Sequence, residues 1–196
     1  SDIDVLTHEA GHAFQIYMSR DLYFAEYITP TMESAEIYSR AMEFFTYPWM
    51  ELFFKEDTDK YKFSHLSSLI SGFLYQSMGD EFQEWIYENP EVEPIERSKK
   101  WKELVKKYLP FSNTESIPFI EEGNQWKDSV HIFQVPFYLI DYALASICAL
   151  QFWSKSKKNE NGNSKEAWND YVKICSLGGS KSFLELLKEA NLESPF

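Results

Sequence analysis

The sequence of 196 residues contains few cysteines, few glycines and no long apolar run. Its two cysteines, Cys148 and Cys175, are too few for a disulfide framework, and their apolar neighbours predict two buried free thiols. Seven glycines and eight prolines beside 17% aromatic residues exclude disorder for most of the chain. The longest apolar stretch, residues 140–153, is interrupted by Asp141 and Gln151 and is shorter than the roughly 20 residues of a membrane-spanning helix. These absences favour a globular fold with a sizeable core.

Basic residues are also scarce. Lys plus Arg number 19 against 31 Asp plus Glu, so the formal net charge is −12. This balance argues against a nucleic-acid partner, because binding a phosphate backbone requires clustered Lys and Arg. No basic segment followed by an apolar one opens the sequence, and two free thiols suit a reducing compartment. We therefore expect a cytoplasmic protein with no membrane partner.

Helical periodicity runs through almost the whole sequence, whereas strand-like alternation is scarce. We therefore predict an all-α fold, organised as a single helical domain over residues 1–196. A break near Gly79 is expected to separate the third helix from the fourth, 110–123 is predicted to be irregular, and 155–164 is predicted to be a polar linker. The expected helices cover residues 6–20, 30–45, 63–77, 80–87, 95–108, 136–153, 165–174 and 180–190.

The residues that suggest chemistry begin with His8-Glu9-Ala10-Gly11-His12, an H-E-x-x-H sequence inside the first expected helix. Residues four apart lie on one face of a helix, so both imidazoles can reach one metal ion, with Glu9 offset toward a water on that ion. Two neutral imidazoles and one carboxylate leave an open position on zinc, which acidifies a water bound there. Glu9 would then accept the proton of this metal-activated water as a general base. The motif predicts a zinc-dependent hydrolase.

A third protein ligand is expected on the second helix. Glu33 and Glu36 follow His12 by 21 and 24 positions, and Glu43 lies two turns beyond Glu36 on the same face. Glu33 belongs to the first turn, where any acid complements the helix dipole, so Glu36 is the better candidate and Glu33 the alternative. Both Glu33 and Glu43 are acidic neighbours of the expected ligands, and Glu43 could orient a ligand imidazole.

A second group of polar side chains accompanies the most apolar expected helix. Tyr138 and Tyr142 are four residues apart, so their hydroxyls point to one side of that helix, and His131 precedes it. A purely structural role for the two tyrosines is the alternative, because the chain has 12 tyrosines and tyrosines often pack with the hydroxyl at the rim of a core. The fourth histidine, His65, has no partner at metal-ligand spacing, and we expect it to be solvated or packed.

Four longer stretches, taken in their order along the chain, are more specific than the five-residue motif. They are THEAGHAFQ, TPTMESAEIYSRAMEFFTYPW, DEFQEWIYENP and HIFQVPFYLIDYALASICALQFW. Together they resemble the M3 family of metallopeptidases, in particular its oligoendopeptidase F branch. The resemblance implies the helical catalytic region of a zincin-type endopeptidase that binds one zinc ion and hydrolyses internal bonds of short peptides. It further implies that His8, His12 and Glu36 are the ligands and that Glu9 is the general base.

The resemblance also assigns roles to the second group. In M3 peptidases a histidine and tyrosines from this region resemble a clamp that donates hydrogen bonds to the tetrahedral intermediate. It thus implies catalytic roles for His131, Tyr138 and Tyr142. Family members are several times longer, so we expect the chain to be a fragment that lacks an N-terminal part and the last C-terminal segment.

Two alternatives stay open at this point. The segment could be a metal-binding helical module without catalytic activity, because the expected front region is missing. Another helical H-E-x-x-H peptidase, such as a metallocarboxypeptidase, would use the same kind of ligands for a different cleavage pattern.

Overall fold

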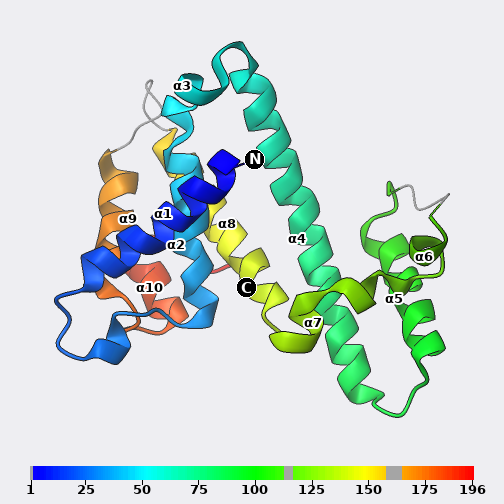
Figure 1. The fold of residues 1–196 in the computed structure, drawn as a ribbon. Helices are drawn as coiled ribbons and strands as arrows, with labels where there is room; N and C mark the ends of the chain where they lie inside the picture. The colour runs from blue at the N-terminus through cyan, green and yellow to red at the C-terminus, as the bar shows by residue number, and fades with distance from the viewer. Residues whose placement is uncertain (1, 113–116, 158–164) are drawn as a thin grey trace. The chain divides into compact units, whose positions relative to one another are not determined.

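The structure, a computed structural model, describes residues 2–112, 117–157 and 165–196 (Figure 1). Within these ranges it contains helices and no strand, which confirms the all-α prediction. The α-helices are α1 (Asp2–Ser19), α2 (Met32–Phe45), α3 (Glu51–Phe54), α4 (Thr58–Glu88), α5 (Pro94–Tyr108), α6 (Pro118–Glu121), α7 (Val130–Gln134), α8 (Leu139–Ser156), α9 (Lys165–Leu177) and α10 (Phe183–Glu189). The short 3-10 helices are η1 (Ala25–Tyr27), η2 (Tyr47–Trp49), η3 (Lys55–Asp57) and η4 (Asn124–Asp128).

The chain divides into two compact units. The first runs to Leu66 and resumes at Leu144, and the second is Ser67–Ala143. Helices α4 and α8 each begin in one unit and end in the other. Among the helices that the structure describes, none combines the length and the apolar character needed to cross a bilayer.

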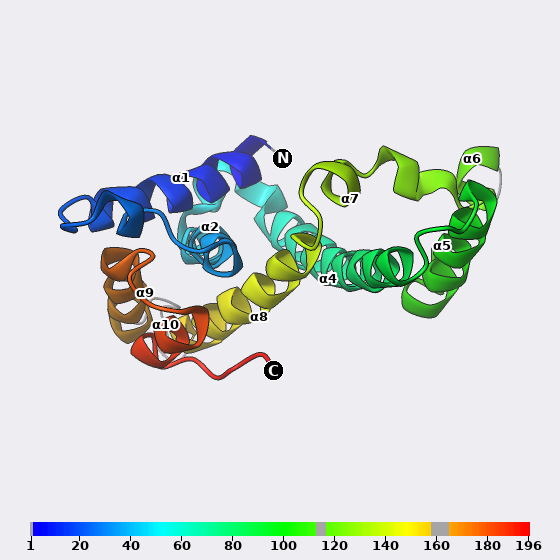
Figure 2. The same ribbon diagram turned by 90° about the horizontal axis from the view of Figure 1, so that it is seen from below.

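In the first unit, α1 packs across α2, as both ribbon views show (Figures 1 and 2). Gly11 marks a close approach of the two helices. A β-carbon at this position would lie 2.6 Å from Ser39 Cα and 2.6 Å from the Tyr38 carbonyl oxygen. Both of these are backbone atoms, which cannot turn aside as a side chain can. The small residue inside the H-E-x-x-H motif is therefore what allows α1 to pack so closely on α2.

Helix α9 packs against α1 and α2 and closes the core of the first unit. The Tyr171 hydroxyl donates to the Tyr38 carbonyl at 3.0 Å, and the Tyr38 hydroxyl donates to the Ile174 carbonyl at 3.5 Å. All three side chains are fully buried. At the end of α8, the Lys155 ammonium pairs with Asp170 of α9. Hydrogen bonds thus fix α9 to α2, and an ion pair joins it to α8.

The loop that leads from α1 into α2 is tied down by polar contacts. The Gln15 amide and the Ser19 hydroxyl each donate to the Ile28 carbonyl at 2.9 Å. The Gly179 N–H donates to the Tyr27 carbonyl at 2.7 Å from the turn after α9. Because this loop is held from both sides, α2 begins at a fixed place relative to α1.

The second unit has its own apolar core. Its centre is an edge-to-face contact between Phe82 of α4 and Trp101 of α5, with ring centroids 4.9 Å apart. Both side chains are fully buried. The buried members of this core are Met78, Phe82, Trp101, Leu104, Trp126, Ile132 and Leu139.

Several predicted helix boundaries are wrong. Helix α1 begins at Asp2 and not at residue 6, α4 begins at Thr58 and not at residue 63, and α10 begins at Phe183 and not at residue 180. Two further differences have a clear structural cause. The break expected near Gly79 is absent, because α4 continues from Thr58 to Glu88. A β-carbon on Gly79 would lie 2.4 Å from Leu139 Cδ1, so this glycine makes room for a core leucine and does not end the helix. The apolar helix expected from Pro136 begins instead at Leu139, because Phe137 has a φ of 62°, which a continuous helix cannot contain.

Of three further predictions, one is confirmed and two differ in part from the structure. The two cysteines are buried and free, as predicted. The stretch 110–123, predicted to be irregular, contains the single helical turn α6. Of the predicted polar linker, the part up to Ser156 belongs to α8, and residues 158–164 lie outside the described residues.

Replacing Gly11 by alanine tests the close contact between α1 and α2. Alanine favours a helix by about 1 kcal/mol over glycine, but here its methyl group overlaps backbone atoms of α2. We expect Gly11→Ala to lower the free energy of unfolding by roughly 1–3 kcal/mol, as overpacking does. Thermal melts followed by circular dichroism measure the change.

Gly72→Ala is the matched control on α4, because a β-carbon there would have its nearest neighbour at 3.7 Å, in the flexible Gln76 side chain. We expect this variant to be as stable as the parent or more stable, by up to about 1 kcal/mol. Equal stability of the two alanine variants would contradict the packing argument.

Candidate metal centre

Helices α1 and α2 bring three of the predicted site residues together. His8 and His12 come from α1 and Glu36 from α2, and their ligand atoms all lie within 4.8 Å of one another. Glu36 Oε2 is 3.2 Å from His8 Nε2 and 3.6 Å from His12 Nε2. The three donors therefore converge on one point between the two helices.

This donor set fits a divalent metal ion. Ligands at about 2.0–2.2 Å from a tetrahedral ion stand about 3.3–3.6 Å from one another. The two distances measured from Glu36 Oε2 are close to these values. Two imidazoles and one carboxylate are also the donors that zinc takes when it keeps one position open. The residues present could thus hold such an ion without a change in helix packing.

Burial distinguishes Glu36 from Glu33. Glu36 is 5% exposed, and the Ser39 hydroxyl donates to its Oε2 at 2.8 Å. Glu33 is exposed and is not part of the group that could hold a metal. The geometry therefore favours Glu36 over the alternative ligand that the sequence left open.

Glu43 contacts two histidines at once. Its Oε1 lies 2.7 Å from His8 Nδ1, and its Oε2 lies 2.7 Å from His65 Nε2. Burial, the largest single influence, would raise the pKa of Glu43, but the hydrogen bonds from His65 and His8 together with the nearby charge of Arg40 lower this pKa. An ionised carboxylate can only accept hydrogen bonds, so both of these nitrogens donate. His8 consequently turns its other nitrogen, Nε2, toward Glu36.

The protonation of His8 follows from the same contacts. Burial would lower its pKa, but hydrogen bonds to Glu36 and Glu43 raise the pKa of His8 to about 9. A ligand imidazole must be neutral. An ion that binds here at neutral pH must therefore displace a proton.

His65, expected from the sequence to be solvated or packed, is packed among aromatic rings, and its contact with Glu43 was not predicted. Its side chain is 7% exposed, and its Nδ1 lies 2.6 Å from the Tyr47 hydroxyl. We call the linked residues His8, Glu43, His65 and Tyr47 the Glu43 network. Its members lie on α1, α2, η2 and α4, and no short spacing in the sequence connects them.

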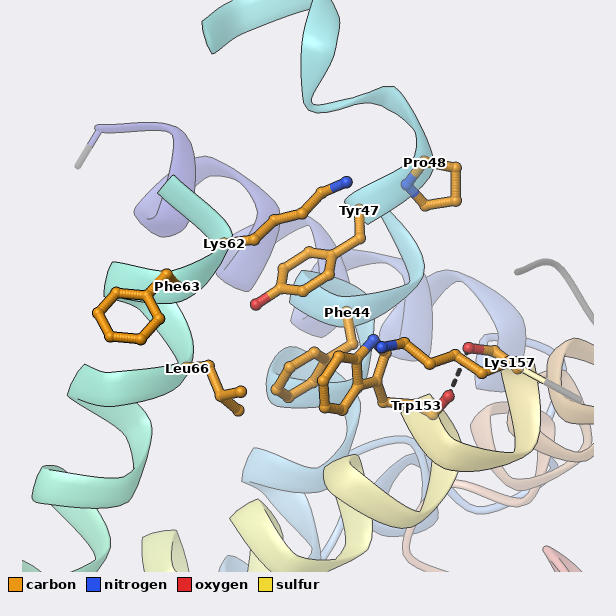
Figure 3. A pocket seen from close by; sticks show the side chains of 9 residues that line it. Phe44, Tyr47, Pro48, Lys62, Phe63, Leu66, Trp153 and Lys157 are labelled. Atoms are coloured by element: carbon orange, nitrogen blue, oxygen red, sulfur yellow. Dashed lines mark hydrogen bonds between the residues drawn. The ribbon is translucent and has the colours of Figure 1, made fainter. Parts of the chain in front are cut away.

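A cavity of about 350 Å³ has Tyr47 among its lining residues (Figure 3). Aromatic and aliphatic side chains form most of its wall, and two lysines stand among them. Its lining residues include Phe44, Tyr47, Phe63, Leu66, Trp153, Lys62 and Lys157. The phenol ring of Tyr47 points across this cavity toward α4 (Figure 3). Tyr47 thus belongs both to the cavity wall and to the Glu43 network.

The remaining predicted catalytic residues are placed as follows. Glu9 is exposed on α1, next to His8. His131, Tyr138 and Tyr142 lie together in the second unit. The His131 ring is 5.6 Å from the Tyr142 ring, and the two tyrosine rings are 4.8 Å apart. Their assignment to catalysis stays a prediction.

Comparisons with known proteins all find similarity to peptidases. A family model described as peptidase family M3 matches residues 1–196. The chain is 30% identical over 211 residues to an oligoendopeptidase F homolog of Borreliella burgdorferi (strain ATCC 35210 / DSM 4680 / CIP 102532 / B31), covering 98% of this chain and 34% of that protein. It is 52% identical to Pz peptidase A solved with an inhibitor, with a TM-score of 0.93 over 99% of this chain and 34% of that one. A structure described as an oligoendopeptidase F from Bacillus anthracis strain Ames is 53% identical, with a TM-score of 0.82 over 99% of this chain and 31% of that one. The chain thus spans about a third of the length of these relatives.

The choice between Glu36 and Glu33 can be tested by metal content. We expect Glu36→Gln to weaken metal binding by more than the roughly 10–100-fold that loss of an outer hydrogen-bond partner costs, because a ligand oxygen is lost. Glu33→Gln is the matched control and should retain the metal of the parent. Plasma mass spectrometry of the dialysed variants measures both, and metal loss in Glu33→Gln alone would contradict the assignment.

The raised pKa of His8 predicts that protons compete with the metal. Below about pH 9 His8 is protonated, so metal uptake releases a proton and the apparent affinity rises about tenfold per pH unit. Calorimetric titrations at about pH 6 and about pH 8, in buffers of different ionisation enthalpy, measure this release. An affinity that is the same at both pH values would show that His8 is not displaced from a protonated state.

Proposed function

The chain belongs to peptidase family M3, and on that premise we propose that it forms part of the catalytic region of a zinc-dependent endopeptidase. The substrates would be short oligopeptides, cleaved at internal bonds. The observation that carries this proposal is the convergence of His8, His12 and Glu36, with Glu36 Oε2 at 3.2 and 3.6 Å from the two imidazole nitrogens. The names of the relatives favour internal cleavage over removal of C-terminal residues.

Different residues of this chain have different roles in the proposed peptide hydrolysis. A zinc ion, when bound, supplies Lewis acidity that lowers the pKa of water and polarises the scissile carbonyl. Glu9 is exposed beside His8, where a water and a peptide can reach its carboxylate. Glu9 accepts the proton of the attacking water as the new C–O bond forms, and delivers a proton to the leaving amine as the C–N bond breaks. Glu43 keeps the Nδ1 of His8 occupied, so that His8 Nε2 is the nitrogen that serves as ligand.

We extend the proposal to His131, Tyr138 and Tyr142 as hydrogen-bond donors to the substrate. Support comes from the resemblance of this segment to the family and from the clustering of the three rings. Such donors act where negative charge develops during the reaction, and the loss of one costs about 3 kcal/mol of transition-state stabilisation.

The remaining expectations continue as proposals. We propose that the 196 residues are a piece of a longer enzyme, which is supported by their coverage of 34% of the relatives' length. A cytoplasmic location and the absence of nucleic-acid and membrane partners stay predictions from the sequence.

Glu9→Gln tests the mechanism in the full-length protein. We expect it to keep the fold and the bound metal, because Glu9 is exposed and is not a member of the metal-binding group. Loss of the general base should lower kcat by roughly 10²–10⁴-fold. Hydrolysis of a quenched fluorescent peptide measures the rate. Glu26→Gln, a second exposed glutamate, is the control and should cleave like the parent; parent-like turnover in Glu9→Gln would remove Glu9 from the mechanism.

A further inference from the structure

We propose that His65 and Tyr47 are positioning residues for the metal centre, which hold Glu43, and through it His8, in the orientation that binds the ion. This inference rests on the proposed function, since it concerns the same centre. The observation behind it is a continuous run of three short contacts. They join His8 Nδ1 to Glu43 Oε1 at 2.7 Å, Glu43 Oε2 to His65 Nε2 at 2.7 Å, and His65 Nδ1 to the Tyr47 hydroxyl at 2.6 Å.

Two imidazoles fix the Glu43 carboxylate where one would not. A carboxylate that accepts only from His8 could rotate about its last side-chain bond and keep that hydrogen bond with either oxygen. His65 occupies the second oxygen and so defines the plane of the carboxylate. Because Glu43 is only 4% exposed, no bulk water stands ready to replace His65 as a donor. The direction of the His8 ring therefore depends on a residue that does not touch the ion.

The surroundings of His65 limit its own movement. Its ring stacks on Tyr61 at a centroid distance of 5.9 Å and meets the edge of Phe44 at 5.4 Å. Tyr61 in turn donates from its hydroxyl to Asp4 Oδ1 at 2.6 Å, which ties this part of α4 to α1. His65 is thus held in an aromatic enclosure while it donates to Glu43.

Tyr47 selects the tautomer of His65. A neutral imidazole donates from one nitrogen and accepts at the other. In the neutral tautomer that donates from Nε2 to Glu43, Nδ1 accepts from the Tyr47 hydroxyl. A hydrogen bond at one ring nitrogen determines which nitrogen carries the proton, so Tyr47 keeps the proton of His65 facing Glu43.

Metal affinity in the full-length protein tests this inference separately from catalysis. Zn²⁺ dissociation constants come from competition with a chromogenic chelator, and the Co²⁺ absorption spectrum reports ligand geometry. We expect His65→Phe, which keeps an aromatic ring but has no donor, to weaken Zn²⁺ binding by about 10–100-fold and to change the Co²⁺ spectrum. Tyr47→Phe should act in the same direction with a smaller effect. His65→Gln, whose amide can donate to Glu43, should recover part of the affinity.

Tyr61→Phe is the matched control. It removes a buried hydroxyl from the same enclosure and breaks the hydrogen bond to Asp4, but leaves the Glu43 network intact. We expect its Zn²⁺ affinity to stay within about twofold of the parent, although its melting temperature falls, as for the loss of a hydrogen bond of about 1 kcal/mol. The comparison separates loss of stability from loss of positioning.

The outcomes are distinguishable. Metal binding in the parent that His12→Ala abolishes, together with weakened binding in His65→Phe and Tyr47→Phe, supports both the centre and this inference. Parent-like affinity and spectra in folded His65→Phe and Tyr47→Phe, or an equal loss in Tyr61→Phe, would overturn the inference and leave the proposed function standing. Absence of any metal binding that depends on His12 in the parent would overturn both.

Discussion

The contact between α1 and α2 at Gly11 sets the separation on which the metal centre depends. Metal–ligand distances are fixed to within about 0.2 Å, and the ligands here come from two helices, both histidines from α1 and the glutamate from α2. A β-carbon at Gly11 would lie 2.6 Å from backbone atoms of Ser39 and Tyr38. Glycine at the third position between the two histidines therefore serves the packing of the helices, while the histidines and Glu9 serve the chemistry.

One face of α2 carries two buried carboxylates with different tasks. Glu36 and Glu43 are two turns apart, so both point toward α1. Two nearby buried negative charges would oppose each other unless each had its own partners. Glu36 lies near both histidine nitrogens of the centre and accepts from Ser39, whereas Glu43 accepts from His8 and His65. The Glu43 network thereby stabilises a buried charge and, by our proposal, directs a ligand imidazole.

The features that the sequence predicts well are those that depend on local periodicity. The i, i+4 spacing of His8 and His12 and the seven-residue spacing of Glu36 and Glu43 place each pair on one helix face, and α2 lies within the predicted helix 30–45. Burial then separated Glu36 from Glu33, which spacing alone had left open.

The parts that were missed depend on contacts between distant segments. His65 lies 22 residues from Glu43, and Tyr61 lies 57 residues from Asp4, so no short motif links them. Glycine often ends a helix, but Gly79 lies inside α4, where the absence of a side chain leaves space for Leu139. The strained φ of Phe137, which decides where α8 begins, has no signal in residue type, because a bulky residue rarely adopts it.

We expect one metal ion to bind between α1 and α2. An anomalous difference map from crystals of the zinc-loaded full-length protein, recorded on both sides of the zinc absorption edge, tests it most directly. We expect a single strong peak at about 2.0–2.2 Å from His8 Nε2, His12 Nε2 and a carboxylate oxygen of Glu36. A peak bound by Glu33 in place of Glu36, or a zinc peak elsewhere with none between these two helices, would contradict it.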